Sequence, residues 1–270
     1  MKYKAIFSDF DGTLYRSDYT ISDKNKDAIH RYINAGGKFV LATGRLFQAI
    51  YPKAMELGLD GDIVVYQGAG IYDLASKKMF YSHLFERELA IEVASYLDNL
   101  KDIVPMAYID DQCCTQFANP FTDNFAKICQ ISYRKTGQKL EDFVRDSQSL
   151  PIKLLTLVDP KDAPRVESEA RAVFGDRVAL CRSNPFILEF LPMGIDKGNA
   201  IEFLWKRYGL TRDEVIAVGD SENDLSMIKR AGLGIATANA FDEVKQQADW
   251  VSVSNDDDAI AQIIDDICLK

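Results

Sequence analysis

Two aspartates that could perform chemistry lie near the start of the chain. Asp9 and Asp11 directly follow an apolar run at residues 4–8, which is typical of a buried strand. Side chains at positions i and i+2 point to the same side of a strand, and Gly12 permits a tight backbone beyond it. Such a pair could bind a hard cation, with one carboxylate attacking phosphorus and the other transferring protons. A solvated turn is the alternative interpretation, because Asp is common in turns.

A hydroxyl group and a glycine follow a second apolar run. Thr43 and Gly44 come after residues 38–42 and just before a helix predicted at residues 46–57. A hydroxyl together with free backbone N–H groups at a helix start suits a phosphate oxygen. Threonine is also an ordinary N-cap residue, so the motif alone leaves both interpretations open.

Lys197 lies in the first turn of another predicted helix. The apolar face of that helix comprises Ile201, Leu204, Trp205 and Tyr208. A positive charge in the first turn is unfavourable for the helix dipole. The mismatch points to an anionic partner, and an exposed lysine without any such partner is the other interpretation.

Acidic and amide side chains follow the apolar run at residues 215–218. Asp220 comes at the predicted strand end and could ligate a metal ion, and Asp224 falls on the same side of the next helix. The amide of Asn223 could donate a hydrogen bond to phosphate or to a carboxylate that holds the metal. An ordinary acidic helix start would produce the same pattern.

Apolar runs and helical patterns alternate in the first and last parts of the chain. The runs lie at residues 4–8, 38–42, 62–66, 215–218 and 250–253. Nearly continuous apolar strands that alternate with helices predict a parallel sheet covered on both faces. Ligands bind beyond the carboxyl ends of such strands. We therefore expect Asp9, Thr43 and Asp220 to meet at one edge of the sheet.

The middle of the chain has a different pattern. Hairpins are predicted at residues 104–117 and 178–191, with helices between them, which indicates an antiparallel sheet with helices on one face. The expected fold class is therefore α/β. A Rossmann-like parallel-sheet core of residues 1–81 and 190–270 would be interrupted by an inserted α+β domain at residues 82–189.

Composition narrows the classes of partner. The formal net charge is −9, which argues against a nucleic-acid-binding surface but not against a small anionic substrate in a locally positive pocket. Five cysteines, among them the adjacent Cys113 and Cys114, and two histidines predict reduced thiols rather than a zinc site. No apolar run reaches the roughly 20 residues of a membrane helix. We expect a cytoplasmic protein without a membrane or nucleic-acid partner, either a monomer or a small homo-oligomer.

Taken together, the four motifs resemble those of the haloacid dehalogenase superfamily. They occupy residues 9–14, 42–45, 196–198 and 219–224, in the order that this superfamily uses. The insertion at residues 82–189 makes the chain similar to the Cof-like branch of sugar-phosphate phosphatases. The resemblance implies magnesium-dependent hydrolysis of a small phosphorylated metabolite through an aspartyl-phosphate intermediate, with the insertion acting as a cap.

The resemblance also implies a role for each residue. Asp9 would be the nucleophile and Asp11 the general acid and base. The metal ligands would be Asp9, the main-chain carbonyl of Asp11, and Asp220, with Asp224 supporting them. The phosphoryl-binding residues would be Gly12, Thr43, Gly44, Lys197 and Asn223, of which Thr43 and Lys197 would also be catalytic.

The sequence departs from the family pattern at Gln67, where the family usually has asparagine. The longer amide could alter a contact near the site. Two other functions stay open at this point, a phosphomutase of the same superfamily and a non-catalytic sensor of a phosphorylated metabolite. The sequence does not distinguish sugar phosphates, pyridoxal phosphate and flavin mononucleotide as substrates.

Overall fold

The computed structural model describes the backbone of residues 1–270 and every side chain except those of Ser183 and Asn184. The chain forms two compact units. The first comprises Met1–Gly44, Tyr51–Phe80 and Asp196–Lys270, and the second Arg45–Ile50 and Tyr81–Ile195. The predicted functional division into a core and a cap, with borders near residues 81 and 190, stays a prediction, because compactness does not reveal what a unit does.

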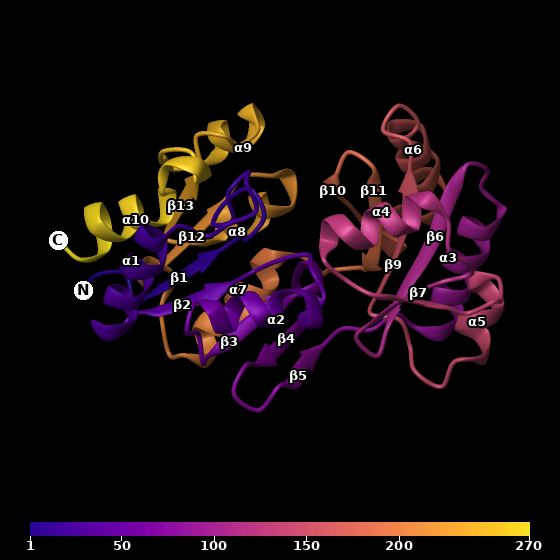
Figure 1. Cartoon of the computed structure of the whole chain (residues 1–270), viewed down its shortest axis with the longest axis horizontal. Helices are drawn as coiled ribbons and strands as arrows, with labels where there is room; N and C mark the ends of the chain where they lie inside the picture. The colour runs from indigo at the N-terminus through magenta and orange to yellow at the C-terminus, as the bar shows by residue number, and fades with distance from the viewer. The chain divides into compact units, whose positions relative to one another are not determined.

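A parallel sheet of five strands forms the centre of the first unit, in the order β14-β13-β12-β1-β2 (Figure 1). The strands are β1 (Ala5–Ser8), β2 (Lys38–Leu41), β12 (Val215–Gly219), β13 (Leu233–Ala236) and β14 (Trp250–Val251). Every neighbouring pair is parallel. The predicted α/β class with a parallel core sheet is therefore confirmed.

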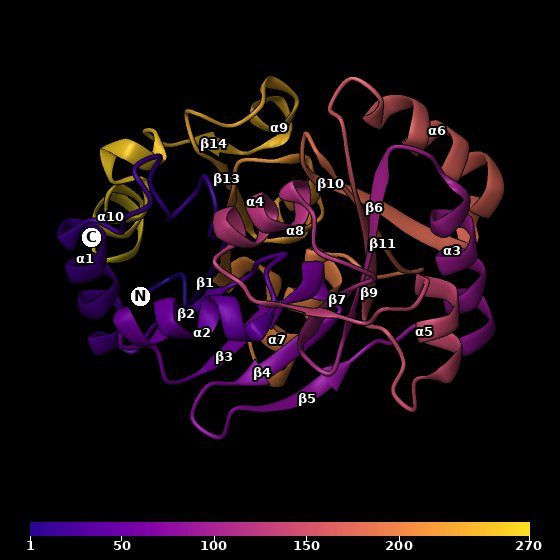
Figure 2. The same cartoon turned by 45° about the vertical axis from the view of Figure 1, so that its right-hand side comes forward.

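Helices cover both faces of this sheet. They are α1 (Asp23–Asn34), α2 (Phe47–Glu56), α7 (Lys197–Arg207), α8 (Leu225–Arg230), α9 (Asp242–Gln247) and α10 (Ala259–Ile263). The connection from β1 through α1 to β2 runs across the sheet in the opposite direction to that from β12 through α8 to β13. Because such crossovers are right-handed, α1 and α8 lie on opposite faces (Figure 2).

A smaller sheet extends the first unit. It contains β3 (Asp62–Val65), β4 (Gly70–Asp73) and β5 (Lys78–Ser82), in that order. The sequence correctly predicted a strand at residues 62–66, but its expected place in the parallel sheet is only partly correct. β3 pairs antiparallel with β4 and meets the parallel sheet through an isolated bridge between Ala42 and Val64.

The second unit contains a sheet of six strands in the order β10-β11-β9-β6-β7-β8. These are β6 (Ile103–Ile109), β7 (Gln112–Thr115), β8 (Tyr133–Lys135), β9 (Lys153–Val158), β10 (Val178–Asn184) and β11 (Ile187–Pro192). The pairs are antiparallel except β7 with β8. Both predicted hairpins are present, as β6–β7 and β10–β11.

Four helices accompany this sheet, namely α3 (Arg87–Asn99), α4 (Pro120–Cys129), α5 (Leu140–Asp146) and α6 (Ala163–Phe174). Apolar side chains of α3, α5 and α6 share one core with the sheet, for example Ala94, Val144, Phe174 and Phe190. The predicted helical layer on one face of an antiparallel sheet is therefore present. Among the described residues, no helix has the length and apolar character that crossing a bilayer requires.

Candidate active site

Strand register places Asp9 beside Asp220. β1 lies between β12 and β2, and Ser8 pairs with Val218 on one side and with Leu41 on the other. Asp9 continues this register, because its N–H donates to the carbonyl oxygen of Val218 at 2.9 Å. The carboxyl ends of β1 and β12 thus lie side by side, as parallel pairing requires.

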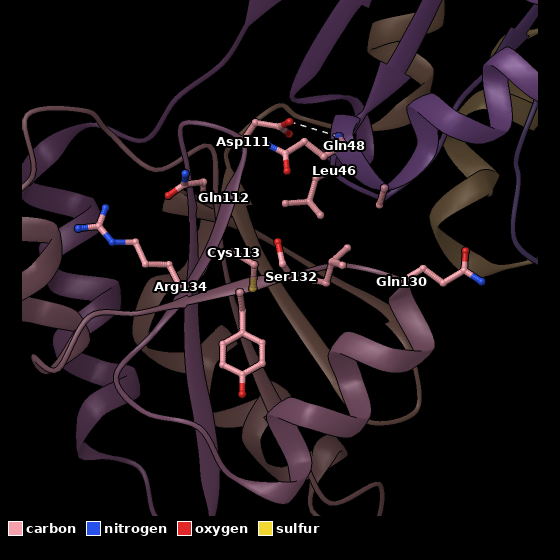
Figure 3. A pocket seen from close by; sticks show the side chains of 11 residues that line it. Leu46, Gln48, Asp111, Gln112, Cys113, Gln130, Ser132 and Arg134 are labelled. Atoms are coloured by element: carbon pink, nitrogen blue, oxygen red, sulfur yellow. Dashed lines mark hydrogen bonds between the residues drawn. The ribbon is translucent and has the colours of Figure 1, made fainter.

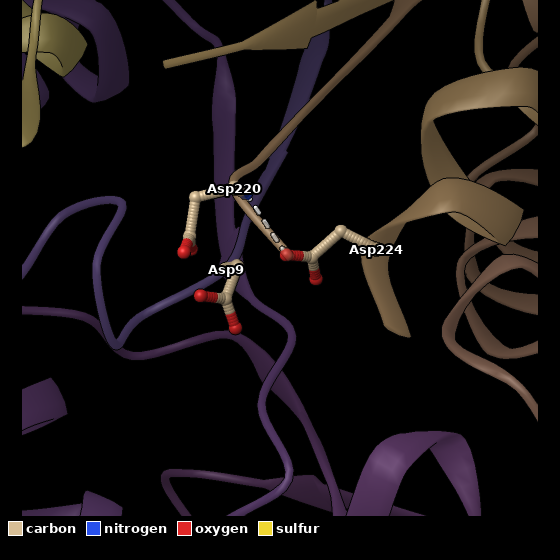
Figure 4. A group of neighbouring side chains, drawn as sticks. All are labelled: Asp9, Asp220 and Asp224. Carbon is tan, nitrogen blue, oxygen red and sulfur yellow. Dashed lines mark hydrogen bonds between the residues drawn. The ribbon is translucent and has the colours of Figure 1, made fainter. Parts of the chain in front are cut away.

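Three carboxylates meet at these strand ends. Asp9, Asp220 and Asp224 each offer one oxygen, and these oxygens all lie within 4.8 Å of one another (Figure 4). Asp9 is 6% exposed and Asp224 is fully buried. Carboxylate oxygens are the ligands that Mg²⁺ prefers. The donor set therefore fits a magnesium ion.

Lys197 joins the same cluster from the first turn of α7. Its Nζ donates to Oδ1 of Asp9 at 2.5 Å and to Oδ1 of Asp224 at 2.7 Å. Its side chain is completely buried. The interpretation of Lys197 as an exposed surface residue is therefore wrong, because these two bonds hold its ammonium group inside the protein. They also show that its anionic partners include side chains of the protein itself.

The cluster holds more negative than positive groups. Burial raises the pKa of Asp9 well above its usual range, Asp224 raises it further, and Lys197 opposes both. Burial and Asp224 likewise raise the pKa of Asp220 to about 6. Although burial lowers the pKa of Lys197, Asp224 and Asp9 hold it above its usual value, so the ammonium stays charged. A divalent cation would relieve the repulsion among the carboxylates.

Two hydroxyl groups and a glycine hold Asp220 in place. Thr13 donates from its hydroxyl to Oδ1 of Asp220 at 2.9 Å, and Ser221 donates to Oδ2 at 2.8 Å. Gly12 adopts a φ of +80°, and a Cβ there would lie 2.7 Å from Oδ2 of Asp220. Gly12 was assigned to phosphate binding, which stays a prediction, and the structure shows that a side chain at this position would collide with the Asp220 carboxylate.

Asp224 is oriented by the backbone of the same turn. Its Oδ2 accepts hydrogen bonds from the N–H groups of Asp220 and Ser221, both at 3.0 Å. Its Oδ1 accepts from Lys197. These contacts fix the Asp224 carboxylate beside Lys197 and the Asp220 backbone, and its supporting role at a metal ion stays a prediction.

The other residues that the sequence assigned to the site differ in exposure and in hydrogen-bond partners. Asp11 is exposed, and its side chain is outside the group of three carboxylates. Thr43 is buried and follows β2, where its N–H donates to Val64. Asn223 donates from Nδ2 to Oε1 of Gln67 at 3.0 Å. A Cβ on Gly44 would lie 2.3 Å from Nε2 of that same glutamine.

Sequence reasoning missed the residues that hold the Asp9 loop from outside. Asn239 donates from Nδ2 to the carbonyl oxygen of Gly12 at 2.8 Å, and Asn255 donates to that of Tyr15 at 2.9 Å. Thr13 was also missed. These contacts join residues more than two hundred positions apart, so no local spacing pattern could have predicted them.

A separate cavity of about 390 Å³ lies within the second unit, to which the start of α2 belongs (Figure 3). Its lining includes Gln48, Asp111, Cys113 and Arg134. Asp111 accepts hydrogen bonds from the N–H groups of Phe47 and Gln48 and so caps α2. Burial raises the pKa of the Cys113 thiol, which keeps it protonated and argues against a reactive thiolate.

Comparison with known proteins decides the family. A model of haloacid dehalogenase-like hydrolases matches residues 6–264. The chain belongs to this family. Within it, the chain falls in the Cof-like branch, so the expected class of a phosphatase-type hydrolase is confirmed at the level of the family.

Individual haloacid dehalogenase-like relatives cover nearly the whole chain. A Bacillus subtilis protein named 5-amino-6-(5-phospho-D-ribitylamino)uracil phosphatase YwtE is 30% identical, with 98% of each chain covered. A crystal structure of a haloacid dehalogenase-like hydrolase from Bacteroides thetaiotaomicron has a TM-score of 0.85 and 34% identity, and it covers 98% of this chain and 100% of its own.

One relative is longer than this chain. An Arabidopsis thaliana protein named chloroplastic endoribonuclease YBEY is 31% identical over 277 residues. The match covers 97% of this chain but 46% of that protein, so the chain spans about half of its length.

Proposed function

We propose that the protein is a magnesium-dependent phosphatase that hydrolyses small phosphorylated metabolites through an aspartyl-phosphate at Asp9. The observation that carries the proposal is the cluster in which Asp9 shares Lys197 with Asp224 and lies beside Asp220. In this cluster a buried carboxylate, the proposed nucleophile, lies next to further carboxylates that could bind a cation and next to the ammonium group of Lys197. Phosphoryl transfer depends mainly on such positioning and positive charge.

In the first half of the reaction, an oxygen of Asp9 attacks phosphorus. The new bond joins Asp9 to the phosphoryl group, and the bond from phosphorus to the leaving alcohol breaks. Asp11 donates a proton to that alcohol oxygen. Asp11 is exposed in this structure, which leaves it accessible to a substrate that enters from solvent.

In the second half, Asp11 takes a proton from a water molecule. The water oxygen attacks phosphorus, the bond from phosphorus to Asp9 breaks, and inorganic phosphate leaves with Asp9 restored as a carboxylate. Lys197 stays charged throughout and neutralises phosphoryl oxygens next to the oxygen of Asp9 that it already contacts at 2.5 Å. Thr43, Gly44 and Asn223 would bind the same oxygens.

Asp9, the main-chain carbonyl of Asp11, and Asp220 would hold the magnesium ion. The ion would supply positive charge that lets Asp9 act in its ionised form in spite of its burial. Thr13 and Ser221 would then keep both oxygens of Asp220 in fixed directions. We further propose that residues 82–189 select the leaving group, as expected for a cap.

The substrate is proposed as a class. The name of the Bacillus subtilis relative describes a phosphate ester on a polyol chain, and that supports a small phosphomonoester as the substrate here. A panel of sugar phosphates, polyol phosphates, pyridoxal phosphate and flavin mononucleotide, with free phosphate as the readout, tests the proposal. We expect release that requires magnesium and disappears in the Asp9→Asn variant. Transfer of phosphate between hydroxyls without release would indicate a phosphomutase, and binding without turnover a sensor.

A further inference from the structure

The turn between β3 and β4 has an unusual backbone. Tyr66, Gln67 and Gly68 adopt φ values of 53°, 59° and 99°, so three consecutive residues occupy the left-handed region. For Tyr66 and Gln67, which carry side chains, this region is disfavoured. Such a conformation persists only where the surrounding structure holds it, and it often marks a functional position.

The backbone of this turn touches two segments of the candidate site. The N–H of Gln67 donates to the carbonyl oxygen of Thr43 at 3.1 Å. A Cβ added to Gly68 would lie 2.4 Å from the carbonyl oxygen of Asp196, the residue directly before Lys197. The turn therefore packs against both the Thr43 loop and the start of the helix that carries Lys197.

The side chain of Gln67 reaches a third segment. It is 2% exposed, and its Oε1 accepts a hydrogen bond from Nδ2 of Asn223 at 3.0 Å. Its Nε2 lies so close to Gly44 that a Cβ there would come within 2.3 Å. The amide is thus wedged between the Thr43–Gly44 loop and the turn that bears Asn223.

This contact determines how Asn223 can act. One hydrogen of its amide is committed to Gln67, and its Oδ1 is buried without a hydrogen-bond partner among the described residues. Gln67 therefore sets the rotation of the Asn223 amide and the direction of its second N–H. An isolated asparagine at this turn would be free to rotate.

We propose that Gln67 is a positioning residue for the phosphoryl-binding site, acting through the Asn223 amide. This inference rests on the proposed function and adds to it a residue whose side chain bonds Asn223. The glutamine side chain is long enough to reach from this turn to Asn223.

The test compares Gln67→Met with the wild type. Methionine has nearly the same length and volume as glutamine, but its thioether sulfur is only a weak acceptor for the hydrogen bond from Asn223. Binding of inorganic phosphate in the presence of magnesium, measured by titration calorimetry, reports the site without requiring turnover. We expect the phosphate affinity of Gln67→Met to fall about tenfold, since a bond that orients a donor to a charged group is lost.

A double-substitution cycle with Asn223→Ala identifies the route of the effect. If Gln67 acts through Asn223, then Gln67→Met causes no further loss of phosphate affinity once Asn223 is alanine. Losses that multiply, or an unchanged affinity in Gln67→Met, would overturn the inference. The matched control is Gln246→Met, the same substitution at an exposed position of α9, which should bind phosphate as the wild type does.

A second variant covers the case in which Gln67→Met does not fold. Gln67→Asn keeps an amide and tolerates the left-handed backbone well, but it is one methylene shorter than the span to Asn223. We expect the same tenfold loss of phosphate affinity, and wild-type affinity in the folded variant would contradict the inference. A wild type that binds phosphate but releases none from any ester would refute the proposed function. The effect of Gln67→Met on phosphate binding could still be measured in that case.

Discussion

Each unit of the molecule contains a buried lysine paired with carboxylates, and the two arrangements differ in charge. In the second unit, Lys153 forms an ion pair with Glu189, and its Nζ lies 4.6 Å from the ring centre of Tyr108. The two charged side chains are 2% and 3% exposed. In the first unit, Lys197 contacts both Asp9 and Asp224, and Asp220 lies beside them.

Burial alone therefore does not mark an active site in this protein. Lys153 and Glu189 pair one positive with one negative charge, an arrangement that structural ion pairs also have. Burial raises the pKa of Asp9 and of Asp220, and the excess of negative charge among three aspartates around one lysine raises both further. Such a cluster could bind a cation, and perturbed carboxylates of this kind cluster at functional sites.

The largest effect is expected from Asp9→Asn. The substitution removes the nucleophile, so phosphate release should fall below detection. Because an ionised Asp9 is disfavoured by burial and by Asp224, the neutral amide should leave the metal-free fold at least as stable as the wild type. Thermal denaturation and a phosphate-release assay on the same preparation test both statements. Turnover near the wild-type rate would refute the role of Asp9.

The same substitution at both buried lysines tests the comparison directly. Lys197→Met should lower kcat by about 10²–10³-fold, the range found when one donor to a developing oxyanion is removed. Lys153→Met should instead destabilise the fold by about 3–5 kcal/mol, because it removes the ammonium that pairs with the buried carboxylate of Glu189. Denaturant unfolding and the activity of the folded fraction separate the two effects. A loss of kcat in Lys153→Met at unchanged stability would contradict the structural role that we give to Lys153.

Gly12→Ala should weaken magnesium binding by about 10–100-fold, the usual cost of disturbing a group that orients a metal ligand. A Cβ at this position would lie 2.7 Å from the carboxylate of Asp220 and would push it away. Gly209→Ala is the matched control, since Gly209 also has a positive φ, +69°, but nothing lies near its Cβ position. Equal magnesium affinity in both variants would contradict the role given to the space that Gly12 leaves for Asp220.

The smallest effect concerns stability and pH. The raised pKa of Asp220 means that the folded, metal-free protein binds a proton that the unfolded chain releases near pH 3.8. The contribution of Asp220 to the free energy of unfolding is therefore fully present below pH 3.8 and is lost as the pH rises through about 6. Asp9, whose pKa is also raised, acts in the same direction.

Magnesium should reverse this loss, because it binds the ionised carboxylates. At a concentration about 100 times its Kd, it should add about 2.7 kcal/mol of stability, roughly 5–10 °C in Tm. The shift in Tm should be larger above pH 7 than near pH 5, where protons compete with the ion. In Asp220→Asn most of the magnesium shift should disappear. A magnesium shift that does not depend on pH would contradict the assignment of these ligands.

The sequence predicted the parts of the site that follow from strand ends. Asp9 and Asp220 could be brought together because each directly follows an apolar strand of one parallel sheet, whose carboxyl ends must coincide. Lys197 was singled out by its mismatch with the helix dipole. Its two partners could not be derived, because they depend on how deeply α7 packs against the sheet.

Other features could not be predicted because no local pattern encodes them. The bond from Thr13 to Asp220 joins distant segments, and the left-handed backbone of Gln67 is held by contacts with Thr43 and Asn223. The pairing of β3 depended on β4, a short strand next to a glycine-rich turn. The unusual residue at position 67 was visible in the sequence, but its place between Gly44 and Asn223 required the structure.

The central claim is that Asp9 becomes phosphorylated during turnover. The most direct measurement mixes the protein with magnesium and an aryl phosphate, quenches the reaction in acid within the first turnover, and locates the phosphoryl group by peptide mass spectrometry. We expect a phosphoryl group on the peptide that contains Asp9 in the wild type, and none in Asp9→Asn. Phosphate release with the phosphoryl group on another residue, or with no covalent intermediate at all, would contradict it.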